Sequence, residues 1–92
     1  MEFEWDDAKS EQCLRKRGFS FGFVVAAFDD PHRRVETDER WEYDEVRYRL
    51  YGRIGDRLFV LVYTVRGGAI RIISARKANA RERRRHGDEG TP

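Results

Sequence analysis

With 92 residues and a formal net charge of +2, the chain has room for one domain with one core, near the small end of what folds without covalent links. The single cysteine, Cys13, excludes an internal disulfide, and with only two histidines beside it a zinc cluster is not expected. The longest apolar run, residues 58–65, is too short to span a membrane, and no signal peptide is evident. We therefore expect a soluble protein of the reducing cytoplasm.

Charge is distributed unevenly along the chain, although its sum is small. Residues 66–86 include eight basic side chains against one acid, whereas residues 36–45 include six acids against one base. Sixteen of the nineteen basic residues are arginine, which binds phosphate through two parallel hydrogen bonds and stacks on bases better than lysine does. The pattern favours a phosphate-binding surface, and a solvated face of salt bridges is the alternative.

The first predicted elements are a short strand and two helices. Residues 3–5 form an apolar patch among acids, which predicts an edge strand. Asp6 is a typical N-cap, and the helix that it begins ends at Gly18 and has a thin apolar face, as a surface helix does. Ser20 begins a second helix, which ends at Asp29-Asp30-Pro31 because proline cannot continue the hydrogen-bond ladder. Its apolar side chains follow the helical spacing at Phe21, Val24, Val25 and Phe28.

The middle of the chain has the pattern of β-strands. Residues 32–37 form a short predicted strand, and residues 46–54 alternate, with apolar side chains on one face and arginines with Tyr51 on the other. A Gly-Asp pair predicts a hairpin turn into residues 58–65, which are apolar on both faces like a central strand. A Gly-Gly pair then returns the chain into a β-branched strand over residues 70–74.

Asn79 and Glu82 have the spacing of a capping box and predict a short C-terminal helix, which Gly87 ends. The order of elements is β-α-α-β-β-β-β-α. It predicts an α+β fold, in which two N-terminal helices pack on one face of a small antiparallel sheet and a short helix closes the chain. We expect one domain over residues 1–86 and a disordered tail over residues 87–92.

The last strand runs directly into the basic helix, so the end of the sheet and the most positive segment meet at one corner. We expect the functional site there. Arg71 and Arg76 would point to opposite faces of a regular strand, because side chains alternate. They share a site only if the strand ends or bends before Arg76.

Motifs along nearly the whole chain, from Phe3 to about His86, occur in the order of a known family. They are Phe3-Glu4-Trp5-Asp6 with Lys9, Leu14-Arg15-Lys16 before Gly18-Phe19-Ser20-Phe21, Phe28-Asp29-Asp30-Pro31, Glu45-Val46-Arg47-Tyr48 with Gly52, Tyr63-Thr64 with Arg66-Gly67, and Arg71-Ile72-Ile73-Ser74-Ala75-Arg76-Lys77-Ala78 with Glu82. On these motifs the chain resembles the BrnT family.

The resemblance implies the toxin of a bacterial type II toxin–antitoxin pair, a ribonuclease with a RelE-like fold. It further implies BrnA as the partner, a ribbon-helix-helix antitoxin that neutralises the toxin and represses their shared operon. We expect a heterotetramer built on the antitoxin dimer, contact with operator DNA only through the antitoxin, and no cofactor or metal. Two positions depart from the family: Arg17 replaces a usual histidine, and His86 replaces a frequent tyrosine.

RNA cleavage without a metal uses the 2′-hydroxyl to attack the adjacent phosphate. It requires removal of the 2′ proton, stabilisation of charge on the phosphorane and protonation of the leaving 5′-oxygen. Arg47, Arg66, Arg71 and Arg76 are candidates for charge stabilisation, because each matches a family motif in or beside the sheet. The alternative for each of them is a surface salt bridge to a nearby acid.

Lys16 and His86 are the candidates for proton transfer. Lysine serves if burial or neighbouring cations lower its pKa, and histidine titrates near neutrality without such help. The alternative makes Lys16 a helix C-terminal charge and His86 a frayed helix end. Glu45 is expected to pair with an arginine across the sheet, and His32 receives no role.

Three functions follow in order of preference. The first is an endoribonuclease toxin that acts on mRNA and is held inactive by an antitoxin. The second is a non-catalytic nucleic-acid binder that uses the same basic corner, and the third is a scaffold that completes a repressor complex. Trp41, Tyr43 and Tyr51 are possible anchors for a partner, and ordinary packing is their alternative.

Overall fold

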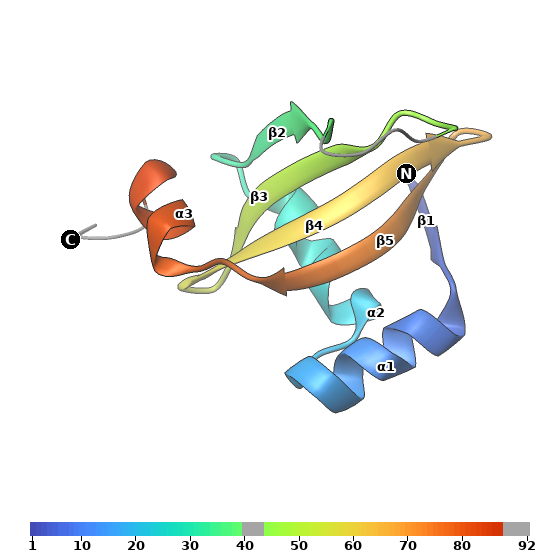
Figure 1. The fold of residues 1–92 in the computed structure, drawn as a ribbon, viewed down its shortest axis with the longest axis horizontal. Helices are drawn as coiled ribbons and strands as arrows, with labels where there is room; N and C mark the ends of the chain where they lie inside the picture. The colour runs from blue at the N-terminus through green and yellow to red at the C-terminus, as the bar shows by residue number, and fades with distance from the viewer. Residues whose placement is uncertain (40–43, 88–92) are drawn as a thin grey trace.

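A computed structural model describes residues 1–39 and 44–87 of the chain and places their strands in one five-stranded mixed sheet (Figure 1). The elements are β1 (Glu2–Trp5), α1 (Asp7–Arg17), α2 (Phe21–Val24), the 3₁₀ helix η1 (Val25–Asp29), β2 (Arg34–Thr37), β3 (Tyr48–Ile54), β4 (Arg57–Arg66), β5 (Ala69–Lys77) and α3 (Ala80–Arg85). The α+β class is therefore confirmed, whereas the RelE-like assignment stays a prediction.

The sheet order β1-β5-β4-β3-β2 corrects the prediction of an antiparallel sheet. The strands β2 to β5 pair antiparallel, but β1 pairs parallel with β5 through Glu2↔Ala69 to Trp5↔Ile72. The chain leaves β1 through α1, re-enters the sheet at the opposite edge with β2, and returns strand by strand until β5 lies beside β1. The alternation of apolar and polar residues that identified each strand does not specify which neighbour it pairs with.

The helices begin where the sequence predicts, but the second one is shorter. Asp6 caps α1 by accepting hydrogen bonds from the main chain of Ala8 and Lys9, and Gly18 ends it at a positive φ of 89°. Ser20 caps α2, which turns into a 3₁₀ helix at Val25 after a single α-helical turn. Adjacent β-branched residues there disfavour a longer α-helix. The prediction of two N-terminal α-helices on the sheet thus holds only in part.

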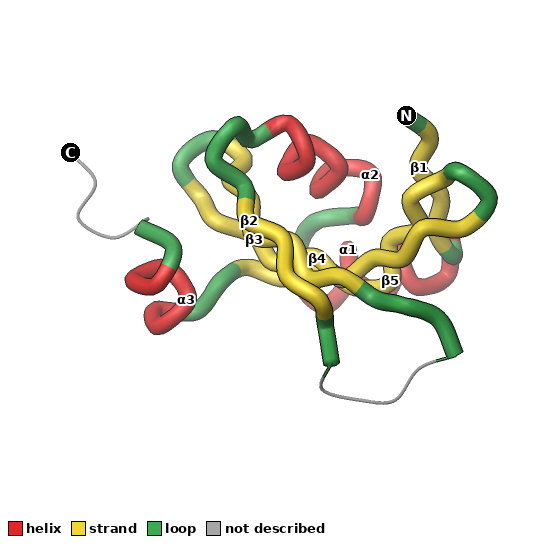
Figure 2. Tube along the Cα trace, turned by 90° about the horizontal axis from the view of Figure 1, so that it is seen from above, coloured by secondary structure: helices red, strands yellow, loops and turns green. Residues whose placement is uncertain are grey.

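The hydrophobic core lies between the sheet and the segment from α1 to η1, on the lower side in Figure 1. Its buried residues are Cys13, Phe19, Phe21, Val24, Ala27, Leu50, Phe59, Leu61, Ile72 and Ala75. A second, smaller cluster lies under α3, where Ala78 packs with Tyr51, Leu58 and Val60. Figure 2 shows α3 at one end of the sheet, apart from α1 and α2.

A β-bulge in β5 decides which face its arginines occupy. The pairing shifts between Val62↔Ser74 and Tyr63↔Ile72, so Ile73 is an extra residue in β5. The bulge inverts the alternation of side chains, and Ile72 and Ala75 both contribute to the core between sheet and helices. Arg71 and Arg76 consequently share the opposite face. We call this face, which the segment from α1 to η1 leaves uncovered, the open face.

The structure predicts that Gly52→Ala destabilises the fold. A Cβ at Gly52 of β3 would overlap the carbonyl oxygen of Ala27 in η1, so the two backbones must separate. We expect a loss of about 1–3 kcal/mol in the free energy of unfolding, which urea titration measures.

Gly22→Ala is the matched control, because a Cβ there meets only ordinary van der Waals contacts with Ser20 and Trp5. It replaces a helical glycine, so its expected effect is neutral or slightly stabilising. Equal stabilities for the two variants would contradict the close approach of β3 and η1.

Candidate functional site

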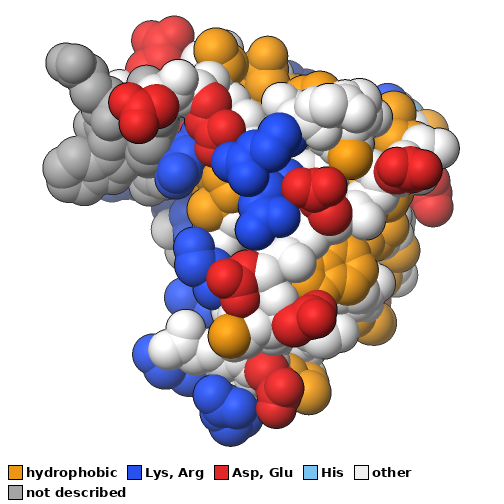
Figure 3. All heavy atoms as spheres, turned by 90° about the vertical axis from the view of Figure 1, so that its right-hand side faces the viewer, with side chains coloured by type: hydrophobic (Ala, Val, Ile, Leu, Met, Phe, Trp, Pro, Cys, Tyr) orange, Lys and Arg blue, Asp and Glu red, His pale blue; other side chains and the backbone are white. Residues whose placement is uncertain are grey.

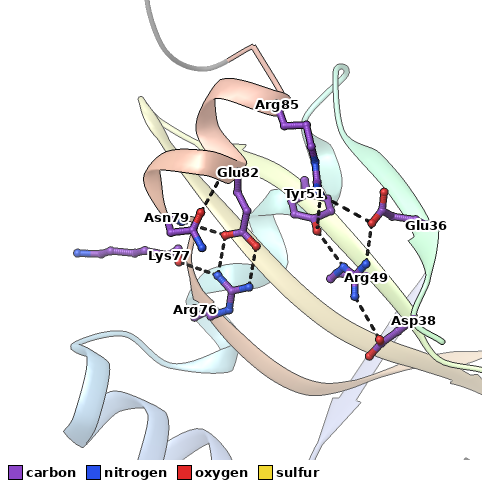
Figure 4. Close-up of polar contacts among 9 residues, drawn as sticks. All are labelled: Glu36, Asp38, Arg49, Tyr51, Arg76, Lys77, Asn79, Glu82 and Arg85. Atoms are coloured by element: carbon purple, nitrogen blue, oxygen red, sulfur yellow. Dashed lines mark hydrogen bonds and ion pairs between the residues drawn. The ribbon is translucent and has the colours of Figure 1, made fainter. Parts of the chain in front are cut away.

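The start of α3 is attached to the end of β5 by one carboxylate. Glu82 accepts hydrogen bonds from Arg76 Nη1 at 2.8 Å and Nη2 at 2.7 Å, so both carboxylate oxygens bind the guanidinium (Figure 4). Glu82 Oε1 also accepts the main-chain N–H of Asn79 at 2.9 Å, and Asn79 Oδ1 accepts the N–H of Glu82 at 2.8 Å. The predicted capping box is confirmed, and Arg76 is incorporated into it.

Glu82 is only 8% exposed, and its charge is stabilised by its neighbours. The hydrogen bonds from Arg76 come first among the causes that lower its pKa to about 2, and the N–H of Asn79 adds to them against the opposing effect of burial. The ion pair is therefore intact throughout the neutral range.

A second network lies beside the first on the open face and is centred on Arg49. Its guanidinium donates to Glu36 Oε1 at 2.7 Å, to Asp38 Oδ1 at 3.1 Å and to the hydroxyl of Tyr51 at 2.8 Å. Arg85 of α3 donates to the same hydroxyl at 3.2 Å. Tyr51 thus joins β3 to α3, as Figure 4 shows.

His86 follows α3 and stacks on Tyr51, with ring centroids 3.9 Å apart and an interplanar angle of 22°. Its two ring nitrogens have no hydrogen-bond partner within residues 1–39 and 44–87. Burial, followed by the charge of Arg85, lowers the pKa of His86 below its ordinary value. The shift favours the neutral imidazole, and both of its ring nitrogens are buried.

His86 lines a cavity of about 320 Å³, which we call the His86 cavity. The lining residues are Asp30, His32, Arg34, Tyr51, Arg53, Leu58, His86 and Gly87.

Asp30 holds two parts of this cavity together. Its Oδ1 accepts the main-chain N–H of His32 at 2.9 Å, and its Oδ2 accepts the main-chain N–H of Arg53 at 2.7 Å. The turn after η1 is thereby attached to β3. The residues that line the hollow include two histidines and two arginines together with the carboxylate residue Asp30. Arginine binds phosphate and histidine can transfer protons.

The predicted site residues do not form one site. Arg76 and His86 lie at the α3 end of the sheet, although only His86 lines the cavity. Arg66 ends β4 at the opposite end, roughly 25 Å along the strand from Leu58, which lines the cavity. Lys16 lies on α1 and lines a separate hollow with Ile73 of β5.

Two of the predicted arginines at the far end of the sheet are paired with acids. Arg66 binds both carboxylate oxygens of Glu45 at 3.0 Å, which confirms the expected pairing of Glu45, and Arg71 binds Glu4 at 3.0 Å. Figure 3 shows Lys and Arg interspersed with Asp and Glu on this side of the molecule rather than forming a continuous basic patch. Arg47 precedes β3, where its carbonyl accepts the N–H of Asp38 at 2.8 Å.

Sequence reasoning missed three residues of the His86 cavity: Arg34, Arg53 and His32. Arg53 does carry a signal, because it alternates with Arg49 and Tyr51 along one strand. No local pattern places the turn at residues 30–34 beside the end of α3.

The proposed partner anchors have different outcomes. Tyr51 is 3% exposed and packs under α3, so it is not available as a surface anchor. Trp41 and Tyr43 lie outside the described residues. Most of the predicted tail, residues 88–92, lies outside them too.

Within the two described ranges, no three His, Cys, Asp or Glu side chains are grouped so that they could hold a metal ion. In that part of the chain no helix is long and apolar enough to cross a membrane.

Residues 5–82 match the model of a family described as "Ribonuclease toxin, BrnT, of type II toxin-antitoxin system". No curated protein matches the chain significantly. The match includes only the last residue of β1, covers α1, α2, η1 and the strands β2 to β5, and ends at Glu82, before His86.

The pairing of Glu82 with Arg76 predicts a stability that depends on pH. Because the folded pKa of Glu82 is about 2, below the ordinary value of 4.5, its contribution is complete above pH 4.5 and is lost as pH falls toward 2. Glu82→Gln should therefore lower the free energy of unfolding at pH 7 by about 2 kcal/mol, and by progressively less in acid.

Urea unfolding at pH 7, 5 and 3.5 measures this difference. Glu11→Gln is the control, because Glu11 pairs with Arg15 on the exposed surface of α1 and should contribute little at any pH. A difference between Glu82→Gln and wild type that does not change with pH would contradict the assignment.

Proposed function

Because the chain belongs to the BrnT family of ribonuclease toxins of type II toxin–antitoxin systems, we propose that it is an endoribonuclease that cleaves mRNA at the His86 cavity. The reaction needs no metal ion, and loss of mRNA inhibits translation. The observation that carries the proposal is the composition of the cavity, because two histidines and two arginines are among the residues that line its volume of about 320 Å³.

The proposed reaction uses the 2′-hydroxyl of the substrate. Both ring nitrogens of His86 are buried in the structure, so the step requires the imidazole to turn toward the cavity. Neutral His86 then removes the 2′ proton, the 2′-oxygen attacks the adjacent phosphorus, and the bond from phosphorus to the 5′-oxygen breaks. His32, the second imidazole of the cavity, donates the proton to the leaving oxygen. The products are a 2′,3′-cyclic phosphate and a 5′-hydroxyl, and no oxidant or reductant is needed.

Arg34 and Arg53 are proposed to bind the scissile phosphate, because guanidinium groups keep their charge and bind two phosphate oxygens at once. Arg76 is proposed to have a positioning role instead. Its guanidinium is bound to Glu82, so it positions α3 and thereby His86. Arg76→Ala is consequently a poor test of catalysis, since it releases α3 whether or not Arg76 contacts RNA.

The remaining predictions for individual residues stand as predictions. Lys16, Arg47, Arg66 and Arg71 do not line the His86 cavity, so we propose that they contact more distant nucleotides of the RNA.

We further propose the partners that the resemblance implies. A BrnA-like ribbon-helix-helix antitoxin neutralises the toxin in the cytoplasm, and two copies of each chain form a heterotetramer. Operator DNA is contacted only through the antitoxin. Membership of a type II toxin–antitoxin family supports the existence of such a partner.

The second candidate function is a non-catalytic nucleic-acid binder. It is favoured by the carboxylate partners of Arg66, Arg71 and Arg76, which reduce the charge available for a transition state. An intact chain that binds RNA without cleaving it would support this reading.

Substitution of the proposed base tests the first function. We expect His86→Gln to reduce cleavage of a short RNA by about 10²–10⁴-fold, because glutamine preserves polarity and cannot transfer the proton. Cleavage is followed with purified protein in EDTA, and a substrate with 2′-deoxyribose at the cleaved position should be resistant.

Arg84→Gln is the control, since Arg84 is an exposed residue of the same helix. Undiminished cleavage by His86→Gln would exclude His86 as the base. A folded wild-type chain that binds RNA and cleaves none would exclude the nuclease and favour the binder.

The lowered pKa of His86 predicts the acid limb of the pH–rate profile. A general base acts only when it is unprotonated, so kcat/KM falls as pH drops through the pKa of His86. Because burial and Arg85 lower that pKa, the limb should lie below the ordinary histidine value of about 6.5. Arg85→Gln, which removes a lowering charge, should move the limb upward, and an unchanged limb would contradict this origin.

A further inference from the structure

A second hollow, the phenylalanine groove, lies between the C-terminal end of α1, the start of α2 and the β3–β4 turn. Its volume is about 590 Å³, and it shares no lining residue with the His86 cavity. Its apolar lining comes from Leu14, Phe19, Phe23, Ile54 and Phe59.

The phenyl rings of this groove form a continuous surface from the core to solvent. Phe59 and Phe19 are buried and meet edge to face with centroids 5.1 Å apart, and Phe23 lies 6.0 Å from Phe59. Phe23 is nevertheless 51% exposed, and Leu14 beside it is 49% exposed. Half-exposed large apolar side chains around a hollow are typical of a protein-binding surface.

The rim of the groove is basic. Arg17, Arg57 and Lys77 line it against one acid, Asp56. All three basic side chains belong to exposed residues, and none of them forms an ion pair within the part of the chain that the structure describes. Arg49, Arg71 and Arg76 of the open face are bound to carboxylates, whereas this rim presents charge that a partner has to complement.

We propose that the phenylalanine groove binds an acidic amphipathic helix of the antitoxin. The inference rests on the proposed neutralisation by an antitoxin and not on the proposed nuclease chemistry. Apolar side chains of the partner helix would contact Phe23 and Leu14, while its acids would face the basic rim.

A helix fits better than an added strand or an RNA. Phe59 of β4 is paired on both sides, with Gly52 of β3 and Lys77 of β5, so no strand edge is open beside it. The aliphatic side chains of Leu14 and Ile54 offer no hydrogen bond to a base. An apolar groove with a basic rim is complementary to a helix that has one apolar face and one acidic face.

The experiment uses the full chain and, as the probe, the product of the reading frame adjacent to its gene. Calorimetry and inhibition of RNA cleavage are measured for wild type and for Phe23→Glu. We expect Phe23→Glu to weaken binding by at least about 30-fold, because it removes a central apolar anchor and repels the acids of the partner. Arg57→Glu should weaken binding by about 10-fold and reduce its dependence on salt.

Val65→Glu is the matched control, since Val65 is 57% exposed, similar to the 51% of Phe23, but lies near the opposite end of β4. Its binding should equal that of wild type. All variants are first shown to be folded by their thermal unfolding. RNA cleavage by Phe23→Glu alone should equal that of wild type and should no longer be suppressed by the probe.

Wild-type affinity in folded Phe23→Glu, or absence of any binding by wild type, would overturn the proposal. RNA and the probe could also compete for the wild-type chain, while Phe23→Glu abolishes binding of RNA but not of the probe. That result would assign the groove to RNA and would also overturn the proposal. If the chain cleaves no RNA, the calorimetric comparison of probe binding can still be made. The proposal of RNA cleavage and the proposal of antitoxin binding are therefore tested independently.

Discussion

The arrangement of the α3 end of the sheet depends on the contact between Glu82 and Arg76. This carboxylate receives two hydrogen bonds from the last part of β5 and one from the N-terminus of α3, so it fixes the direction in which the helix leaves the sheet. A helix of six residues has little stability of its own. Its orientation must come from such contacts and from the small apolar cluster beneath it.

The position of His86 follows from that anchor. Once α3 is oriented, Arg85 reaches the hydroxyl of Tyr51 and His86 stacks on its ring. The same packing removes water from the imidazole and lowers its pKa. Structural and chemical effects are therefore linked, since a change that loosens α3 also hydrates His86 and returns its pKa toward the ordinary value.

Much of the fold is predictable from local patterns. The caps at Asp6, Ser20 and Asn79 lie where short polar side chains precede helical spacing, because each satisfies main-chain N–H groups that the helix leaves unpaired. The parallel pairing of β1 with β5 was not predictable in this way. It is decided by the packing of distant segments. The sequence of a strand of four residues does not indicate whether it pairs parallel or antiparallel.

The site was only partly predictable for the same reason. His86 could be selected as a candidate by its chemistry, and Arg76 by its place at the corner of sheet and helix. The ion pairs of Arg66 and Arg71, however, depend on Glu45 and Glu4, which lie 21 and 67 residues away along the chain. The bulge at Ile73 also has no signature in the sequence, yet it decides that Arg71 and Arg76 share a face.

The separation of the His86 cavity from the phenylalanine groove has a physical consequence for control. A cavity that binds a polyanion has to keep its cations and its water, so it is a poor source of apolar binding energy. The groove can supply that energy at about 25 cal/mol for each Å² that a partner covers, with little loss in salt. An antitoxin held there would bring further acidic segments to the cavity at high effective concentration, so strong neutralisation would not require strong contacts at the site itself.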